Sequence, residues 1–198
     1  MISERHPRLR FGLRIVLPTL LAIGLFVVAI FALIVPAYER QILDRKREMI
    51  RELTHSAVSM LVEYEREERA GALTREQAQR EAITRLRYLR YGEEGKDYFW
   101  ITDLEPRMIM HPYRPDLEGS DLSRFADPGG NLLFVEMVRV ARERSEGFVE
   151  YVWQWKDDPA RIVPKLSHIR AFEPWGWVVG TGIYLEDVRH EITRLTSH

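Results

Sequence analysis

Hydrophobic residues are distributed unevenly along this chain, and the longest apolar run comes first. Residues Ile15 to Val35 carry no charged side chain over 21 positions. As an α-helix this run would be about 31 Å long, close to the roughly 30 Å thickness of the hydrocarbon core of a bilayer. A cleaved signal peptide is the alternative, but its apolar region normally has about 7–15 residues. The run therefore predicts one transmembrane helix over residues 15–36.

A second helical pattern follows, from about Ala37 to Ala70. Its apolar residues recur at intervals of three, four and seven and form one stripe: Leu43, Ile50, Leu53, Ala57, Met60 and Tyr64. The stripe suits packing on the chain's own domain or against the same helix of a second copy. Both uses fit the pattern, and a homodimer through this long helix is the protein partner that we expect.

A break at Gly71 separates this helix from a shorter one. Thr74 followed by Gln77 has the pattern of a capping box, which marks the start of a helix. The spacing predicts four residues on its buried face: Ala78, Ala82, Leu86 and Leu89.

From Asp97 the apolar pattern changes to a period of two, which is typical of β-strands. Five strands are predicted: Asp97–Thr102, Arg107–His111, Gly147–Trp155, Val163–Phe172 and Trp175–Tyr184. A helix from about Asn131 to Arg144 separates the second strand from the third. Turns rich in Pro, Gly and Asp join the others, which favours an antiparallel sheet with the long helices covering one face. The predicted fold class is therefore α+β.

Composition and motifs narrow the function classes. The formal net charge is −1 and basic residues alternate with acidic ones, so no nucleic-acid partner is expected. The absence of cysteine removes disulfides, thiolate nucleophiles and Cys-type zinc sites. No HExxH, GxSxG, P-loop or GxGxxG sequence occurs, and the six histidines form no i, i+2 or i, i+4 pair. The sequence thus predicts no catalytic residue, no cofactor and no metal site.

Strand parity supplies candidate binding residues. In "GFVEYVWQW", Tyr151 and Trp153 lie on a face that is more aromatic than a solvent-facing surface, and core packing is the alternative explanation. In "VPKLSHIRAF", Lys165 shares its parity with the apolar Val163 and Ile169. An inward lysine needs an anionic partner, whereas on a solvated face it would extend into water. Periodicity leaves both alternatives open.

The stretch "DYFWITDLEPRMIMHP" raises the same question. Tyr98 and Trp100 share one face, and Arg107 and His111 are its two basic groups. They fit a solvated hairpin edge or a pocket that holds an anion. The two glycines of "GTG" in the last strand leave room for a closely packed helix or for a ligand.

The order of these motifs resembles a known family. "YFWI", "MHP", "DLEG", "GFVEYVW", "PKLS" and "EPWGWVVGTGIY" follow a membrane span and a long helix, and over roughly Glu39 to Asp187 they resemble the single Cache domain, type 2 subfamily. The resemblance implies a PAS-like central antiparallel sheet with a long N-terminal helix packed along it. It also implies a non-enzymatic, extracytoplasmic sensor of a bacterial chemoreceptor or histidine kinase that binds a small carboxylate such as acetate, propionate, pyruvate or lactate. A membrane-anchored dimerisation or scaffold module without a small ligand is the alternative.

The resemblance also implies a topology. Basic residues flank the apolar run on both sides, so charge alone does not orient it. A sensor of this family would sit in the inner membrane with residues 1–14 in the cytoplasm, residues 15–36 in the bilayer and the domain of residues 37–187 in the periplasm or outside the cell. Residues 188–198 would be a helical tail directed towards a second span, before which the chain ends.

By the same resemblance, the ligand would lie among six residues: Tyr98, Trp100, His111, Tyr151, Trp153 and Lys165. Arg107 and Met110 are weaker members, and Arg107 fits better as a solvated edge residue. Lys165, with His111 or a tyrosine hydroxyl, would donate charge-assisted hydrogen bonds to a carboxylate held between aromatic walls. His168 stands where the family more usually has a tyrosine.

Overall fold

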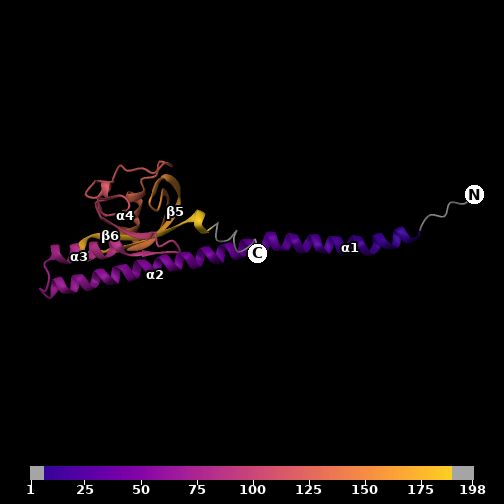
Figure 1. Cartoon of the computed structure of the whole chain (residues 1–198), viewed down its shortest axis with the longest axis horizontal. Coiled ribbons are helices and arrows are strands. Elements are labelled where there is room, and N and C mark those ends of the chain that lie inside the picture. The colour runs from indigo at the N-terminus through magenta and orange to yellow at the C-terminus, as the bar shows by residue number, and fades with distance from the viewer. Residues whose placement is uncertain (1–6, 189–198) are drawn as a thin grey trace, which may run out of the picture. The chain divides into compact units, whose positions relative to one another are not determined.

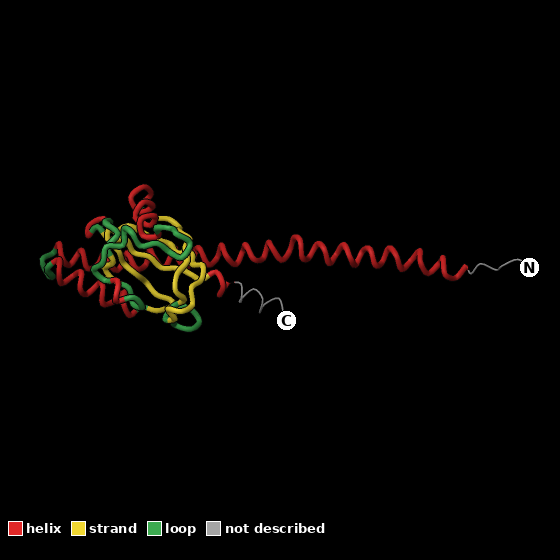
Figure 2. Tube along the Cα trace, turned by 90° about the horizontal axis from the view of Figure 1, so that it is seen from above, coloured by secondary structure: helices red, strands yellow, loops and turns green. Residues whose placement is uncertain are grey.

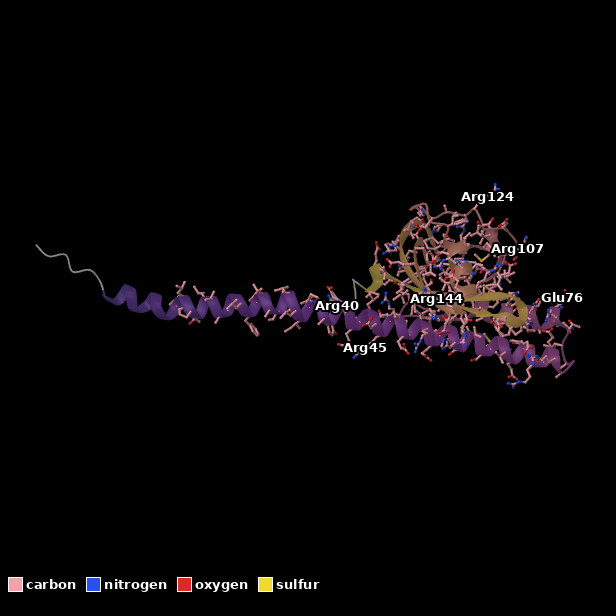
Figure 3. All side chains as sticks on the ribbon, turned by 180° about the vertical axis from the view of Figure 1, so that it is seen from behind. Arg40, Arg45, Glu76, Arg107, Arg124 and Arg144 are labelled. Carbon is pink, nitrogen blue, oxygen red and sulfur yellow. The ribbon has the colours of Figure 1, made fainter. Side chains whose placement is uncertain are left out.

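The computed structural model describes residues 7–188 of the chain. The chain divides into two compact units between Asp44 and Arg45. In the first unit, α1 (Pro7–Ala29) continues through a π-helical turn (Ile30–Ile34) into the start of α2 (Val35–Arg69), and the rest of α2 belongs to the second unit. Apolar side chains project on all sides of this part of the helix (Figure 3). By length and composition, the helix that includes them could cross a membrane.

The second unit is built on one antiparallel sheet. Its strands are β1 (Arg90–Tyr91), β2 (Asp97–Asp103), β3 (Met108–Met110), β4 (Glu146–Trp155), β5 (Asp158–Phe172) and β6 (Trp177–Tyr184). They lie in the order β1-β2-β6-β5-β4, and β3 also pairs with β2. Figure 2 shows the strands in yellow. The last two strands along the chain, β5 and β6, thus occupy the centre of the sheet.

Helices cover both faces of the sheet (Figure 1). The C-terminal half of α2 and α3 (Arg75–Tyr88) pack on one face, where Ala57, Leu61 and Phe99 are buried. On the other face lie α4 (Leu133–Arg144) and the loop before it, with Phe134 and Met137 buried among strand residues. The predicted α+β fold is confirmed, but α4 and its loop close the face that was not expected to carry a helix.

The helix predictions are largely confirmed. The capping box is present, with Gln77 N donating to Thr74 Oγ1 over 3.1 Å and Thr74 N donating to Gln77 Oε1 over 2.8 Å. Ala78, Ala82 and Leu86 are fully buried on α3. Leu89 was wrongly placed on that face, because the helix ends at Tyr88 and Leu89 remains 43% exposed.

Several strand boundaries differ from the prediction. β5 begins at Asp158 rather than Val163, because β4 turns tightly through Lys156, whose positive φ of 49° lets the chain reverse. β6 begins at Trp177 rather than Trp175, since a 3-10 turn (Glu173–Trp175) precedes it. The two-residue strand β1 was not predicted, and it is too short to show a period.

A β-bulge breaks the expected parity of β3. Ile101 pairs with Met110, whereas the next residue, Thr102, pairs with Met108. One extra residue on β3 therefore separates two successive partners, which rotates the strand between them. As a result Met108 lies in the core beneath α4, and Met110 lies in the core beneath α2 and α3. Simple alternation would have placed these two methionines on the same face of the sheet.

The glycines of β6 make room for other parts of the sheet. A Cβ on Gly180 would lie 2.1 Å from Trp100 Cζ2, and one on Gly182 would lie 2.5 Å from the carbonyl oxygen of Leu166. The atoms nearest to both positions belong to neighbouring strands rather than to a helix, so the explanation by a closely packed helix is not supported. The missing side chains let the indole of Trp100 lie flat on the sheet and let β5 approach closely.

Gly180→Ala is therefore expected to lower the free energy of unfolding by about 1–3 kcal/mol, because the added methyl collides with the buried ring of Trp100. Chemical denaturation of the full chain in detergent measures this. Gly24→Ala serves as the control, since a Cβ there meets nothing within 4 Å. An unchanged midpoint for Gly180→Ala would show that the indole has another position available.

Candidate functional site

The buried Lys165 dominates the chemistry of the domain. It lies on β5 opposite Tyr151 of β4 and Tyr184 of β6, and only 1% of it is exposed. Its Nζ donates to Tyr98 Oη over 2.9 Å and lies 4.0 Å from the centroid of the Tyr98 ring. Within residues 16–188, no carboxylate lies within ion-pair distance of this ammonium group. The structure thus places Lys165 on the inward face.

A buried ammonium without a carboxylate is expensive, because desolvation favours the neutral amine. Burial lowers the pKa of Lys165 to about 7, although the nearby carboxyl of Asp97 acts in the opposite direction. The phenol of Tyr98 offers one neutral oxygen and no compensating charge. An anion that reached this ammonium would restore the balance and favour the protonated form.

His111 follows β3 and is 2% exposed. Its Nδ1 accepts a hydrogen bond from the backbone N–H of Tyr113 over 3.2 Å. Burial and the charge of Lys165 hold its pKa well below the usual value, so the ring is neutral. A neutral imidazole that accepts at Nδ1 carries its proton on Nε2. His111 is therefore a neutral hydrogen-bond donor.

A narrow cavity, too tight in this structure to admit a water molecule, lies beside these groups. Six residues from three strands and α4 line it: Trp100, His111, Leu133, Phe134, Tyr151 and Trp153. The buried Trp100 Nε1 has no hydrogen-bond acceptor within the described part of the chain. The hydroxyl of Tyr151 lies 2.9 Å from Ser167 Oγ. The cavity thus combines apolar aromatic walls with N–H and O–H groups.

Lys165 does not itself line this cavity. Tyr98 lies between its ammonium group and His111, which does line it. Its ammonium contacts Tyr98, and the rings of Tyr98 and His111 pack at 4.9 Å between centroids. The polar groups around the cavity are N–H donors or hydroxyls, and the nearest full charge is the positive ammonium of Lys165. Such an arrangement favours a small anion with one apolar end, because the aromatic walls exclude water and strengthen each charge-assisted hydrogen bond.

The structure thus brings together all six residues of the main predicted group. It does not place the two weaker members with them. Met110 packs against the helices on the opposite face of the sheet. The side chain of Arg107 is 53% exposed, and its Nη1 donates to the carbonyl of Gly119 over 3.1 Å (Figure 3). This position agrees with the other sequence-based interpretation, in which Arg107 is a solvated residue at the edge of the hairpin.

Sequence reasoning missed the residues that hold the main group in place. Tyr184 lies 3.4 Å from Tyr98, hydroxyl to hydroxyl. Glu118 accepts from the backbone N–H of His111 over 2.9 Å and forms a bidentate pair with Arg87 at 2.7 and 2.9 Å. The quoted motifs "DLEG" and "GIY" contain Glu118 and Tyr184, but no local pattern revealed their contacts.

A larger cleft of about 580 Å³ opens near the ends of β4 and β6. Its walls carry both basic residues, such as Lys156 and Arg161, and acidic residues, such as Glu94 and Asp187. Two of these already pair, since Lys156 Nζ lies 3.2 Å from Asp187 Oδ2. The mixed charge favours no ligand class, so the buried group around Lys165 is the better candidate despite its smaller volume.

Comparison with known proteins now becomes informative. The family model described as Single Cache domain 2 matches residues 42–197. The chain belongs to this family. Two solved structures agree with the fold: a periplasmic sensor domain of a chemotaxis protein, 43% identical with a TM-score of 0.69, covers 73% of this chain and 98% of that one. A Cache chemosensory domain described by its carboxylic acid recognition is 40% identical, with a TM-score of 0.69, and covers 73% and 97%.

Curated relatives of this single Cache domain are longer receptors. Methyl-accepting chemotaxis protein McpP of Pseudomonas putida is 45% identical over 75% of this chain, which corresponds to 27% of McpP. Sensor histidine kinase MctS of Rhizobium johnstonii is 32% identical over 78% of this chain and 32% of MctS. The chain thus spans about a third or less of these relatives, and it is a Cache sensor domain of the kind found in chemotaxis receptors and sensor kinases.

Proposed function

We propose that this chain is the extracytoplasmic sensor of a bacterial transmembrane receptor and that it binds a small carboxylate. The observation that carries the proposal is the buried ammonium of Lys165, which has no carboxylate partner within the described residues. Folding a desolvated cation into a core costs free energy. A bound anionic ligand would offset that cost.

The remaining groups define the ligand class. One carboxylate would accept from Lys165, and His111, Tyr151 or Trp100 would supply neutral donors. The cavity that these residues line is too tight to admit a water molecule in this structure, so side chains would have to move to admit an acid. This tightness favours small acids such as acetate, propionate, pyruvate and lactate. The related Cache domain whose description names carboxylic acid recognition supports the same class.

The proposal includes a topology and a signal. Residues 15–36 would span the inner membrane, residues 1–14 would be cytoplasmic, and the domain of residues 37–187 would be periplasmic or extracellular. Most of the proposed helical tail of residues 188–198 lies outside the described residues. Two copies would pair through α2, and the ligand would favour one packing of α2 on the sheet over another. The helix carries that difference into the membrane.

A thermal-shift screen of short carboxylic acids on the full chain in detergent tests acid binding. At about 100 times its Kd, a specific acid should stabilise the domain by about 2.7 kcal/mol. Arg107→Gln is the matched control, because Arg107 is basic, close in sequence to His111 and exposed. It should respond to the acid like the wild type. If no short acid raises the midpoint, the scaffold alternative replaces the sensor.

A further inference from the structure

A second cluster of chemically active side chains lies on the other face of the sheet, away from the cavity. His55 comes from α2, Glu146 from the start of β4 and His168 from β5. One ring nitrogen of each histidine and one carboxylate oxygen of Glu146 all lie within 4.8 Å of one another. The two nearest atoms, His55 Nε2 and Glu146 Oε2, are 2.8 Å apart. The fold thus brings together two imidazoles and a carboxylate that are far apart in sequence.

The buried member of this cluster has an unused nitrogen. His168 is 1% exposed, and its Nδ1 makes no hydrogen bond to any described residue. An orphaned buried polar atom normally costs about 1–3 kcal/mol. Burial also lowers the pKa of His168 to about 4, so its imidazole is neutral near pH 7. A neutral imidazole is the form that binds a metal ion.

The rest of the cluster is accessible from solvent. The side chains of His55 and Glu146 are 31% and 36% exposed, so an ion can reach them without unfolding. Two imidazoles and one carboxylate form a donor set that suits Zn²⁺, with water in the fourth tetrahedral position. We propose that His55, Glu146 and His168 form a binding site for a divalent transition-metal ion such as Zn²⁺.

Two arginines face the site and limit its affinity. Arg170 Nη1 lies 3.4 Å from the same Glu146 oxygen that faces His55. The other, Arg51, is occupied by Glu48 at 2.7 Å. Arg170 therefore competes with a cation for Glu146, whereas Glu48 offsets most of the positive charge of Arg51. Replacing Arg170 by glutamine should tighten metal binding, which a purely structural role for the cluster does not predict.

The position of the site suggests what the metal does. His55 lies on α2, and both other ligands lie on the sheet against which α2 packs. A bound ion would join the helix to β4 and β5 at one point and so oppose any movement between them. The site is separate from the proposed acid site, and the metal proposal does not depend on acid binding. The prediction of no metal from sequence spacing did not consider ligands assembled by the fold.

Zinc titration of the full chain in detergent tests the site. We expect one Zn²⁺ per chain to survive gel filtration, and His55→Gln and His168→Phe to weaken its affinity at least about 10-fold each. Glu146→Gln should do the same, while the control Glu63→Gln, an exposed carboxylate on α2 that pairs with Arg66, should not. Arg170→Gln should bind zinc several-fold more tightly. Retention of the far-UV circular dichroism spectrum and of any acid response shows that each variant is folded.

Two results would overturn the metal site. One is the absence of zinc after gel filtration of the wild type. The other is undiminished binding by the His55→Gln, His168→Phe double variant, which would assign the metal to other histidines. A zinc affinity that Arg170→Gln leaves unchanged or weakens would equally contradict the proposed geometry.

Discussion

Lys165→Met is expected to abolish acid binding and, near pH 6, to make the acid-free protein more stable. Methionine fills a similar volume without a charge, so the desolvation cost of the ammonium disappears. We expect a gain of about 1–2 kcal/mol in the free energy of unfolding, after subtracting the lost hydrogen bond to Tyr98. The loss of the charge-assisted contact should weaken acid binding by about 100-fold or more. Isothermal titration calorimetry and chemical denaturation measure the two effects.

The opposite signs of these two effects make the experiment decisive. A lysine that merely supports the core would destabilise the protein when replaced, and a general loss of folding would abolish binding as well. Lys96→Met is the matched control, because Lys96 is a half-exposed lysine paired with Asp157 at 2.9 Å. It should leave acid affinity unchanged and stability nearly so. Wild-type affinity in folded Lys165→Met would remove Lys165 from the acid site.

Acid affinity is expected to be constant from about pH 6 to pH 7 and to fall about tenfold per pH unit above pH 7. The reason is that burial lowers the pKa of Lys165 to about 7, and only its protonated form carries the charge that holds a carboxylate. His111 adds no step in this range, because its own pKa is held well below the usual value. Binding at pH 8 should therefore take up close to one proton per acid, which calorimetry in two buffers of different ionisation enthalpy measures.

The stability of the acid-free protein should change in the opposite direction. The unfolded lysine titrates near pH 10.5 and the folded one near 7, so the unfolded state binds more protons between these values. The contribution of Lys165 to the free energy of unfolding therefore rises as the pH increases from about 7 to 10.5. The full cost of burying its charge is present only below about pH 7, where the folded lysine is protonated. The difference between wild type and Lys165→Met isolates this contribution from other titrating groups. A pH-independent difference, or acid affinity that is flat to pH 9, would show that Lys165 stays charged when buried.

Much of the proposed acid site could be predicted because its residues lie on strands with a clear alternation. Tyr98 and Trp100 on β2, and Tyr151 and Trp153 on β4, face one core as their spacing predicted. Met110 was proposed as a weaker member of the group, but it pairs with Ile101 and faces the core under α2 and α3. The bulge turns Met108, not Met110, to the other face, and it leaves no local mark in the stretch "RMIMHP". The supporting contacts of Glu118 and Tyr184 were missed because each depends on a residue from another element.

The sequence by itself determined the features that depend on neighbouring residues. The apolar run, the change from a helical period to a period of two, the capping box at Thr74 and the ordered family motifs are all local patterns, which the chain carries whatever its final packing. Only the tertiary structure decided that Lys165 is buried with no carboxylate partner among residues 16–188, and that His55, Glu146 and His168 meet. Both outcomes depend on strand register and on which face α2 covers. Those are set by the packing of distant segments, so no window of sequence contains them.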